Sequence, residues 1–140
     1  AMDDVLTQMA RTFNNPQVSI ALDRTFHTTI AGIMENAALD RVVGELFDQR
    51  MTPYFTRLAS YFESAASWRE AFEEHRAVRD AIAAGDPARA RSAMQHHLQQ
   101  SQLRFSRSFD GELESERDRS AKVPRRKQTG IAIQSGRKQQ

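Results

Sequence analysis

One aspartate and three histidines of this chain are spaced in a way that suits a metal site. Asp23 and His27 are four residues apart, so in a helix both side chains lie on one face and can bind one ion. His75 and His97 lie in two further segments with helical periodicity, and the chain contains no cysteine. Three imidazoles and a carboxylate are ligands that Zn, Ni, Fe, Mn or Co accept. On an octahedral ion they would leave positions open for water or a carboxylate.

Helix geometry separates the two adjacent histidines at positions 96 and 97. His97 follows Met94 by three residues and precedes Leu98 by one, which places it on the apolar face of its helix. His96 is rotated away from that face by about 100°, toward solvent. We therefore expect His97 to be a ligand and His96 to be a surface residue. The spacing leaves a second interpretation open, in which the histidines are unrelated core or surface residues.

The motifs of metal-dependent and nucleophilic enzymes are absent from the sequence. There is no His-Glu-x-x-His pair, no glycine-rich phosphate loop and no serine nucleophile elbow. A hydrolase or lyase would need a general base, and only Glu73 and Glu74, next to His75, are candidates. We expect both carboxylates to face solvent. The sequence therefore predicts a binding protein, not an enzyme.

The spacing of apolar residues predicts an all-α protein, an antiparallel bundle of about five helices with a central metal site. Pro53 either kinks the third helix or restarts it. Ser67 and Glu70 form a capping box for the fourth helix, which ends at Gly85. The last helix should fade near Gly111. The expected helices span residues 3–13, 19–36, 37–62, 67–85 and 87–111.

Charge divides the chain into two parts. Residues 113–140 hold eight Lys or Arg and three Asp or Glu, which leaves 12 basic and 15 acidic residues in 1–112. The body therefore carries a net charge of −3 and the tail +5. We expect one helical domain at 1–112 and a disordered basic tail at 113–140. The lack of cysteine, of a membrane-spanning stretch and of a signal peptide predicts a cytoplasmic protein.

Three patterns follow one another along the chain, and together they are specific. They are Asp23-x-x-Phe26-His27-x-x-Ile30 followed by Asn36, then Glu74-His75-x-x-Val78-x-x-Ala81-Ile82-x-x-Gly85-Asp86-x-x-x-Ala90, then Met94-x-x-His97-Leu98. In this order and spacing, over about residues 3–108, the chain resembles the FCD domain. That domain is the C-terminal effector-binding domain of GntR-family bacterial transcriptional regulators.

The resemblance implies a helical bundle that encloses a divalent transition metal (Zn, Ni, Mn or Fe) and binds a small organic acid beside it. It places the family's aspartate on Asp23 and its three histidines on His27, His75 and His97. Asn36 matches an asparagine near the family's pocket.

Two arginines of the third helix are further candidates for effector binding. Arg50 and Arg57 could each meet an effector carboxylate, since a guanidinium offers a bidentate fork. The alternative for both residues is a place on the surface.

The chain departs from the family in one large respect. Such regulators carry a winged helix-turn-helix domain before the effector domain, and this sequence shows none, so we expect a fragment or a stand-alone sensor. DNA binding is implied only for the parent protein. We also expect the first helix of the effector domain to be missing, which would expose an apolar groove and favour a homodimer or instability. Two alternatives stay open: a metal-dependent hydrolase or lyase acting on a small carboxylate, and a structural dimerisation module.

Overall fold

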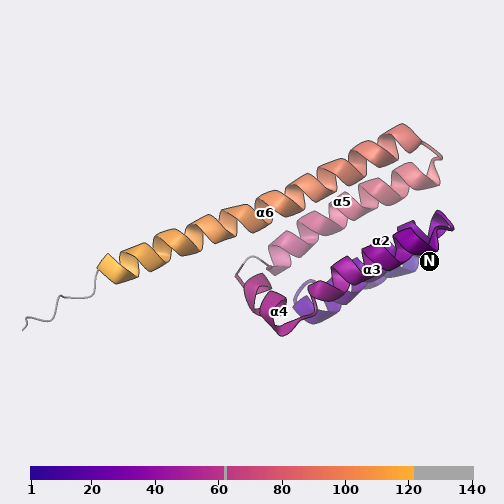
Figure 1. The fold of residues 1–140 in the computed structure, drawn as a ribbon. Coiled ribbons are helices and arrows are strands. Elements are labelled where there is room, and N and C mark those ends of the chain that lie inside the picture. Colours follow the sequence, from indigo (N-terminus) through magenta and orange to yellow (C-terminus); the bar gives the residue numbers. More distant parts are fainter. Residues whose placement is uncertain (62, 122–140) are drawn as a thin grey trace, which may run out of the picture.

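The computed structural model of the chain describes residues 1–61 and 63–121, with side chains described as far as residue 106. Within these ranges it is all-α, without strands, and the long helices run antiparallel along one axis (Figure 1). There are six helices where about five were expected. They are α1 (Met2–Met9), α2 (Pro16–Ile33), α3 (Ala37–Gln49), α4 (Pro53–Ala59), α5 (Ala65–Ala83) and α6 (Pro87–Ala121).

The additional helix arises because the chain restarts at Pro53 and does not merely kink there. The Thr52 side chain accepts a hydrogen bond from the backbone N–H of Phe55, and Pro53 occupies the first turn of α4. A proline is tolerated at that position because its missing N–H would have no helical partner. α4 therefore forms a separate short helix between α3 and α5 at one end of the bundle (Figure 1).

The capping box of α5 lies one turn earlier than the sequence indicated. Ser64 and Ser67 cap each other's backbone N–H groups, and the helix begins at Ala65. Serine at the third helical position replaces the usual Glu or Gln of this motif. The assignment of the box to Ser67 and Glu70 was wrong for that reason. α5 ends as expected before Gly85, whose φ of 66° suits a residue without a side chain.

α6 continues through Ala121, whereas the sequence was expected to leave the helical state near Gly111. One interior glycine costs a helix only about 1 kcal/mol, and the Glu and Arg residues that follow are good helix formers. Residues 113–121, expected to begin a disordered tail, are therefore part of α6. The rest of the predicted basic tail, 122–140, lies outside the described residues, as does Phe62.

The core is formed where α1, α2 and α5 meet. Its main cluster of buried residues contains Phe26 of α2 and Val78 of α5, together with Val5, Leu6 and Met9 of α1. α6 packs along α5 in the most extensive helix contact, and α3 packs along α2 (Figure 1). These contacts fix α2, α5 and α6 relative to one another, and these are the three helices that carry the predicted ligands.

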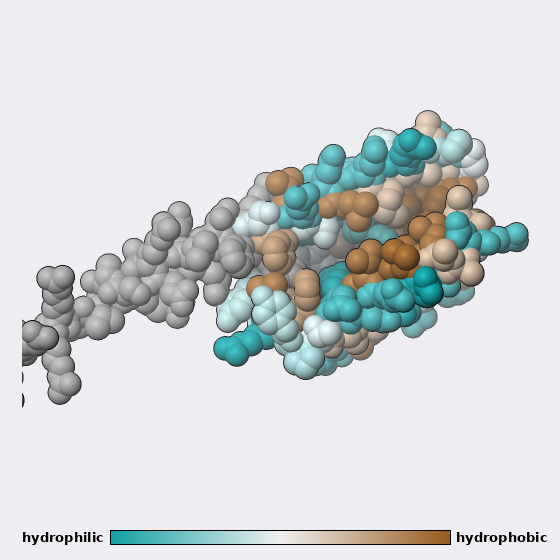
Figure 2. Space-filling view, viewed as in Figure 1, coloured by the Kyte–Doolittle hydropathy of each residue, from teal (hydrophilic) through white to brown (hydrophobic). Residues whose placement is uncertain are grey.

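One face of the bundle is apolar and exposed. A groove of about 550 Å³ runs between α2 and the α5–α6 pair, and Figure 2 shows apolar side chains gathered there. Ile33 and Met34 at its edge are 56% and 67% exposed. In the part of the chain that the structure describes, no helix combines the length and apolar character needed to cross a bilayer.

Candidate metal centre

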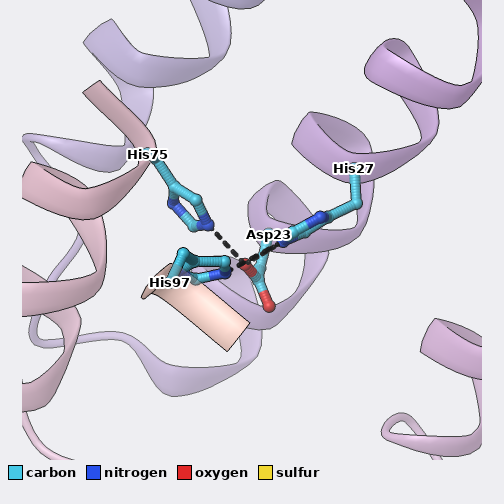
Figure 3. A group of neighbouring side chains, drawn as sticks. All are labelled: Asp23, His27, His75 and His97. Atoms are coloured by element: carbon cyan, nitrogen blue, oxygen red, sulfur yellow. Dashed lines mark hydrogen bonds and ion pairs between the residues drawn. The ribbon is translucent and has the colours of Figure 1, made fainter. Parts of the chain in front are cut away.

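Asp23, His27, His75 and His97 converge on one point between α2, α5 and α6 (Figure 3). One ligand atom from each lies within 4.8 Å of the others, and all four residues are buried. His97 Nε2 lies 3.2 Å from His27 Nε2. Asp23 Oδ1 lies 3.2 Å from His75 Nε2 and 3.6 Å from His27 Nε2. Side chains that are 74 residues apart in sequence therefore face one another at ligand spacing.

These residues fit a metal ion in both spacing and hydrogen bonding. Two nitrogens bound to one ion at 2.0–2.1 Å lie roughly 3.0–3.4 Å apart, depending on the angle between them. The separations of neighbouring ligand atoms here are close to that range. His75 is fully buried, and within the described part of the chain its ring nitrogens make no well-aligned hydrogen bond; Nε2 has only the ion-pair contact with Asp23 Oδ1. A buried polar group without a partner is costly, and a metal bond would remove that cost.

The protonation states of two of these residues favour a cation. Burial alone would raise the pKa of Asp23, but the close contacts with His27 and His75 and the charge of Arg50 hold that pKa well below its usual range. Burial lowers the pKa of His75, and its proximity to Asp23 only partly offsets this effect. At neutral pH the site therefore offers a carboxylate and at least one neutral imidazole, which are the forms that bind metals.

Arg50 connects this cluster to a second buried carboxylate. Its Nη1 donates to Asp23 Oδ2, and its Nη2 donates to Glu63 Oε1 over 2.7 Å. Burial raises the pKa of Glu63 despite the neighbouring guanidinium. The Arg50 guanidinium also lies 5.9 Å from the centre of the Trp68 ring, within cation–π range. Arg50 thus fixes the orientation of the Asp23 carboxylate from the end of α3.

Glu74 orients His97, and the expectation that it faces solvent was wrong. Glu74 Oε2 lies 2.8 Å from His97 Nδ1, and Arg104 donates two hydrogen bonds to the same carboxylate. Burial opposes the charged form, but Arg104 and His97 lower the pKa of Glu74 to about 2. An ionised carboxylate only accepts, so His97 carries a proton on Nδ1, and Nε2 is the nitrogen that faces the cluster. Glu73 is exposed, as expected.

A small pocket opens beside the cluster, with a volume of about 40 Å³. Asp23 and His97 form one wall, and Arg50, Glu63, Trp68 and Arg104 are among the other residues that line it. Of these, sequence reasoning had not selected Glu63, Trp68 or Arg104 for the site. Arg104 could have been found, because it follows His97 by seven residues and so lies on the same helix face. Glu63 lies outside the helices, so no helical spacing relates it to the other site residues.

The three candidates for effector binding have different positions. Arg50 lines the pocket. Asn36 is exposed and caps α3, because its side chain accepts hydrogen bonds from the backbone N–H groups of Ala38 and Leu39. Arg57 is exposed on α4 and does not line the pocket. The structure brings only Arg50 to the cluster.

Residues 1–100 match the family model described as the FCD domain. The chain is also 34% identical over 82 residues to the "Probable D-xylose utilization operon transcriptional repressor" of Paenarthrobacter nicotinovorans. That alignment covers 59% of this chain and 34% of the relative, so the chain spans about a third of the relative's length. No solved structure matches the chain.

Proposed function

This chain belongs to the FCD domain family, and from that membership we propose that residues 1–112 are the effector-binding domain of a transcriptional regulator. The observation that carries the proposal is the buried cluster of Asp23, His27, His75 and His97. We propose that these four residues hold a divalent transition metal, with Zn, Ni, Mn and Fe as the candidates. A small organic acid would bind beside it, in the pocket that Arg50 lines.

Each residue has a defined task in this proposal. A bound metal would supply open coordination positions for a carboxylate oxygen of the effector. Glu74 holds His97 in the tautomer that directs Nε2 inward, and Arg50 holds Asp23. The carboxylate of Asp23 and the neutral ring of His75 are ready to bind a cation without first losing a proton.

The position of Arg50 supports a route from the pocket to the rest of the bundle. Arg50 follows α3, and its partner Glu63 precedes α5, so their ion pair joins the two ends of the segment that contains α4. An effector that alters this contact would bias the arrangement of the helices around the site. We propose that this change is transmitted to DNA-binding domains of the parent protein. The repressor named among the relatives supports a role in transcription control.

The two alternatives have less support. A hydrolase or lyase was expected to need Glu73 or Glu74 as a base, but Glu74 is held by His97 and Arg104, and Glu73 is exposed. A purely structural module would have no use for imidazole nitrogens that face a carboxylate in a buried cluster. Both observations favour the sensor.

Calorimetric titration of metal-loaded and metal-stripped protein with short-chain carboxylic acids tests this function. We expect binding only to the metal-loaded protein, since the effector carboxylate requires an open metal position. Elemental analysis of the purified protein identifies the ion, and product analysis after incubation checks for turnover. Catalytic turnover, or binding that is equal with and without metal, would contradict the proposal.

We also propose that the domain forms a homodimer through its apolar groove. Ile33 and Met34 at the groove edge are more than half exposed, and apolar patches of this kind mark association surfaces. Light scattering is expected to give twice the mass of the chain, and a double Ile33→Lys, Met34→Lys variant is expected to be monomeric. Thr25→Lys, at an exposed position on the same helix, serves as the matched control. If the unsubstituted chain is monomeric at micromolar concentration, the dimer is ruled out.

A further inference from the structure

Two buried polar atoms in the wall of the pocket have no hydrogen-bond partner in the part of the chain that the structure describes. They are Oε2 of Glu63 and Nε1 of Trp68. The Glu63 side chain is only 6% exposed, as is Trp68. Buried polar atoms almost always have a protein or water partner, so an unsatisfied acceptor and an unsatisfied donor in one pocket indicate a missing polar group.

The charged groups of the pocket are already engaged. Both terminal nitrogens of Arg50 donate to carboxylates, one to Asp23 and one to Glu63. Both terminal nitrogens of Arg104 donate to Glu74. A second carboxylate on a ligand would therefore compete with existing ion pairs, and the charge of Glu63 would repel it. The missing group is better matched by a neutral one.

We propose that Glu63 and Trp68 form a hydroxyl-binding subsite, so that the effector is a small acid with a hydroxyl group near its carboxylate. This inference rests on the proposed function, in which the carboxylate binds at the metal. A hydroxyl has one donor and two acceptor sites, so it can donate to Glu63 Oε2 and accept from Trp68 Nε1. A plain carboxylic acid would leave both atoms unpaired or paired only with water.

The size of the pocket favours a small ligand. One water requires about 10–15 Å³, so the 40 Å³ available corresponds to roughly three waters. That space accommodates a hydroxylated carbon and its neighbours but not a ring. The subsite therefore fits acids of three or four carbons.

Matched pairs of acids test the subsite: propionate against lactate, and succinate against malate. In each pair the only difference is one hydroxyl group. Calorimetry on the metal-loaded protein is expected to show at least roughly tenfold tighter binding of the hydroxylated member, because a site with buried polar groups discriminates against a ligand that leaves them unpaired. Succinate is expected to bind no more tightly than propionate.

Variants separate the subsite from the metal. Trp68→Phe removes the N–H donor and keeps an aromatic ring, and Glu63→Gln removes the charge at nearly constant size. Both are expected to lower the ratio of lactate to propionate affinity and the ratio of malate to succinate affinity, because the hydroxyl loses a partner that the plain acids never contact. Equal affinities within each pair for the unaltered protein would overturn the subsite and leave the sensor intact. Absence of binding by all four acids would contradict the proposed function, and the subsite with it.

Discussion

Adding a divalent transition metal to metal-stripped protein is expected to raise its melting temperature by about 10 °C. A ligand present at 100 times its Kd stabilises the folded state by about 2.7 kcal/mol, and each kcal/mol corresponds to about 4 °C in a domain of this size. The reason is that Asp23, His27, His75 and His97 are assembled only in the folded chain. Circular dichroism with and without a chelator measures the shift.

The two adjacent histidines provide the control for this experiment. His97→Ala removes a ligand from the cluster and should abolish most of the metal-dependent shift. His96→Ala changes an exposed residue one position away and should leave the shift unchanged. If the two variants respond to metal alike, the cluster is not the binding site.

Glu73 and Glu74 are adjacent and allow a matched test of whether Glu74 orients the metal ligand His97. Glu74→Gln weakens the contact to His97 Nδ1 and is expected to lower metal affinity by about 10–100-fold. Glu73→Gln alters a carboxylate whose contacts are with Arg76, and it should have no effect. Competition with a colorimetric chelator gives both affinities. Equal affinities for the two variants would mean that Glu74 has no positioning role.

The convergence of the four ligand candidates could be predicted because each lies on an apolar helix face. Asp23 and His27 share a face through their four-residue spacing, and the neighbours of His97 distinguish it from the exposed His96. Inward-facing side chains of neighbouring helices in a small bundle share one narrow interior, so they lie close together. Periodicity therefore predicted that these residues point toward the core, and the resemblance to the FCD domain indicated that they meet there.

The residues around the cluster could not be found in this way. Glu74 is adjacent to His75 in sequence, so periodicity turns it away from the core. It is nevertheless nearly buried, because α6 brings His97 and Arg104 against that side of α5. Glu63 lies between helices, where no period applies, and its role depends on Arg50 reaching it. Contacts between elements, not the pattern within one element, determine both positions.

Arg50→Leu is expected to destabilise the domain by about 3 kcal/mol. The substitution leaves Asp23 and Glu63 buried without their guanidinium, and breaking a buried ion pair costs roughly 3–5 kcal/mol. We take the lower end because the Arg50 side chain is 26% exposed. Urea unfolding of metal-stripped protein measures the change in the free energy of unfolding. Arg57→Leu, at an exposed position on α4, should change it by less than about 0.5 kcal/mol.

A second substitution shows whether the cost comes from charge or from lost packing. Glu63→Leu in the Arg50→Leu background removes one of the two uncompensated carboxylates, so part of the lost stability should return. Asp23 would still be close to His27 and His75, so the loss of Arg50 costs its carboxylate less stability. If the double variant is no more stable than Arg50→Leu alone, the unpaired charge of Glu63 is not the source of the cost. The lost packing of Arg50 against Trp68 and Phe47 then accounts for it, and the charge argument fails. A recovery of stability would establish Arg50 as the counter-charge on which both buried carboxylates depend.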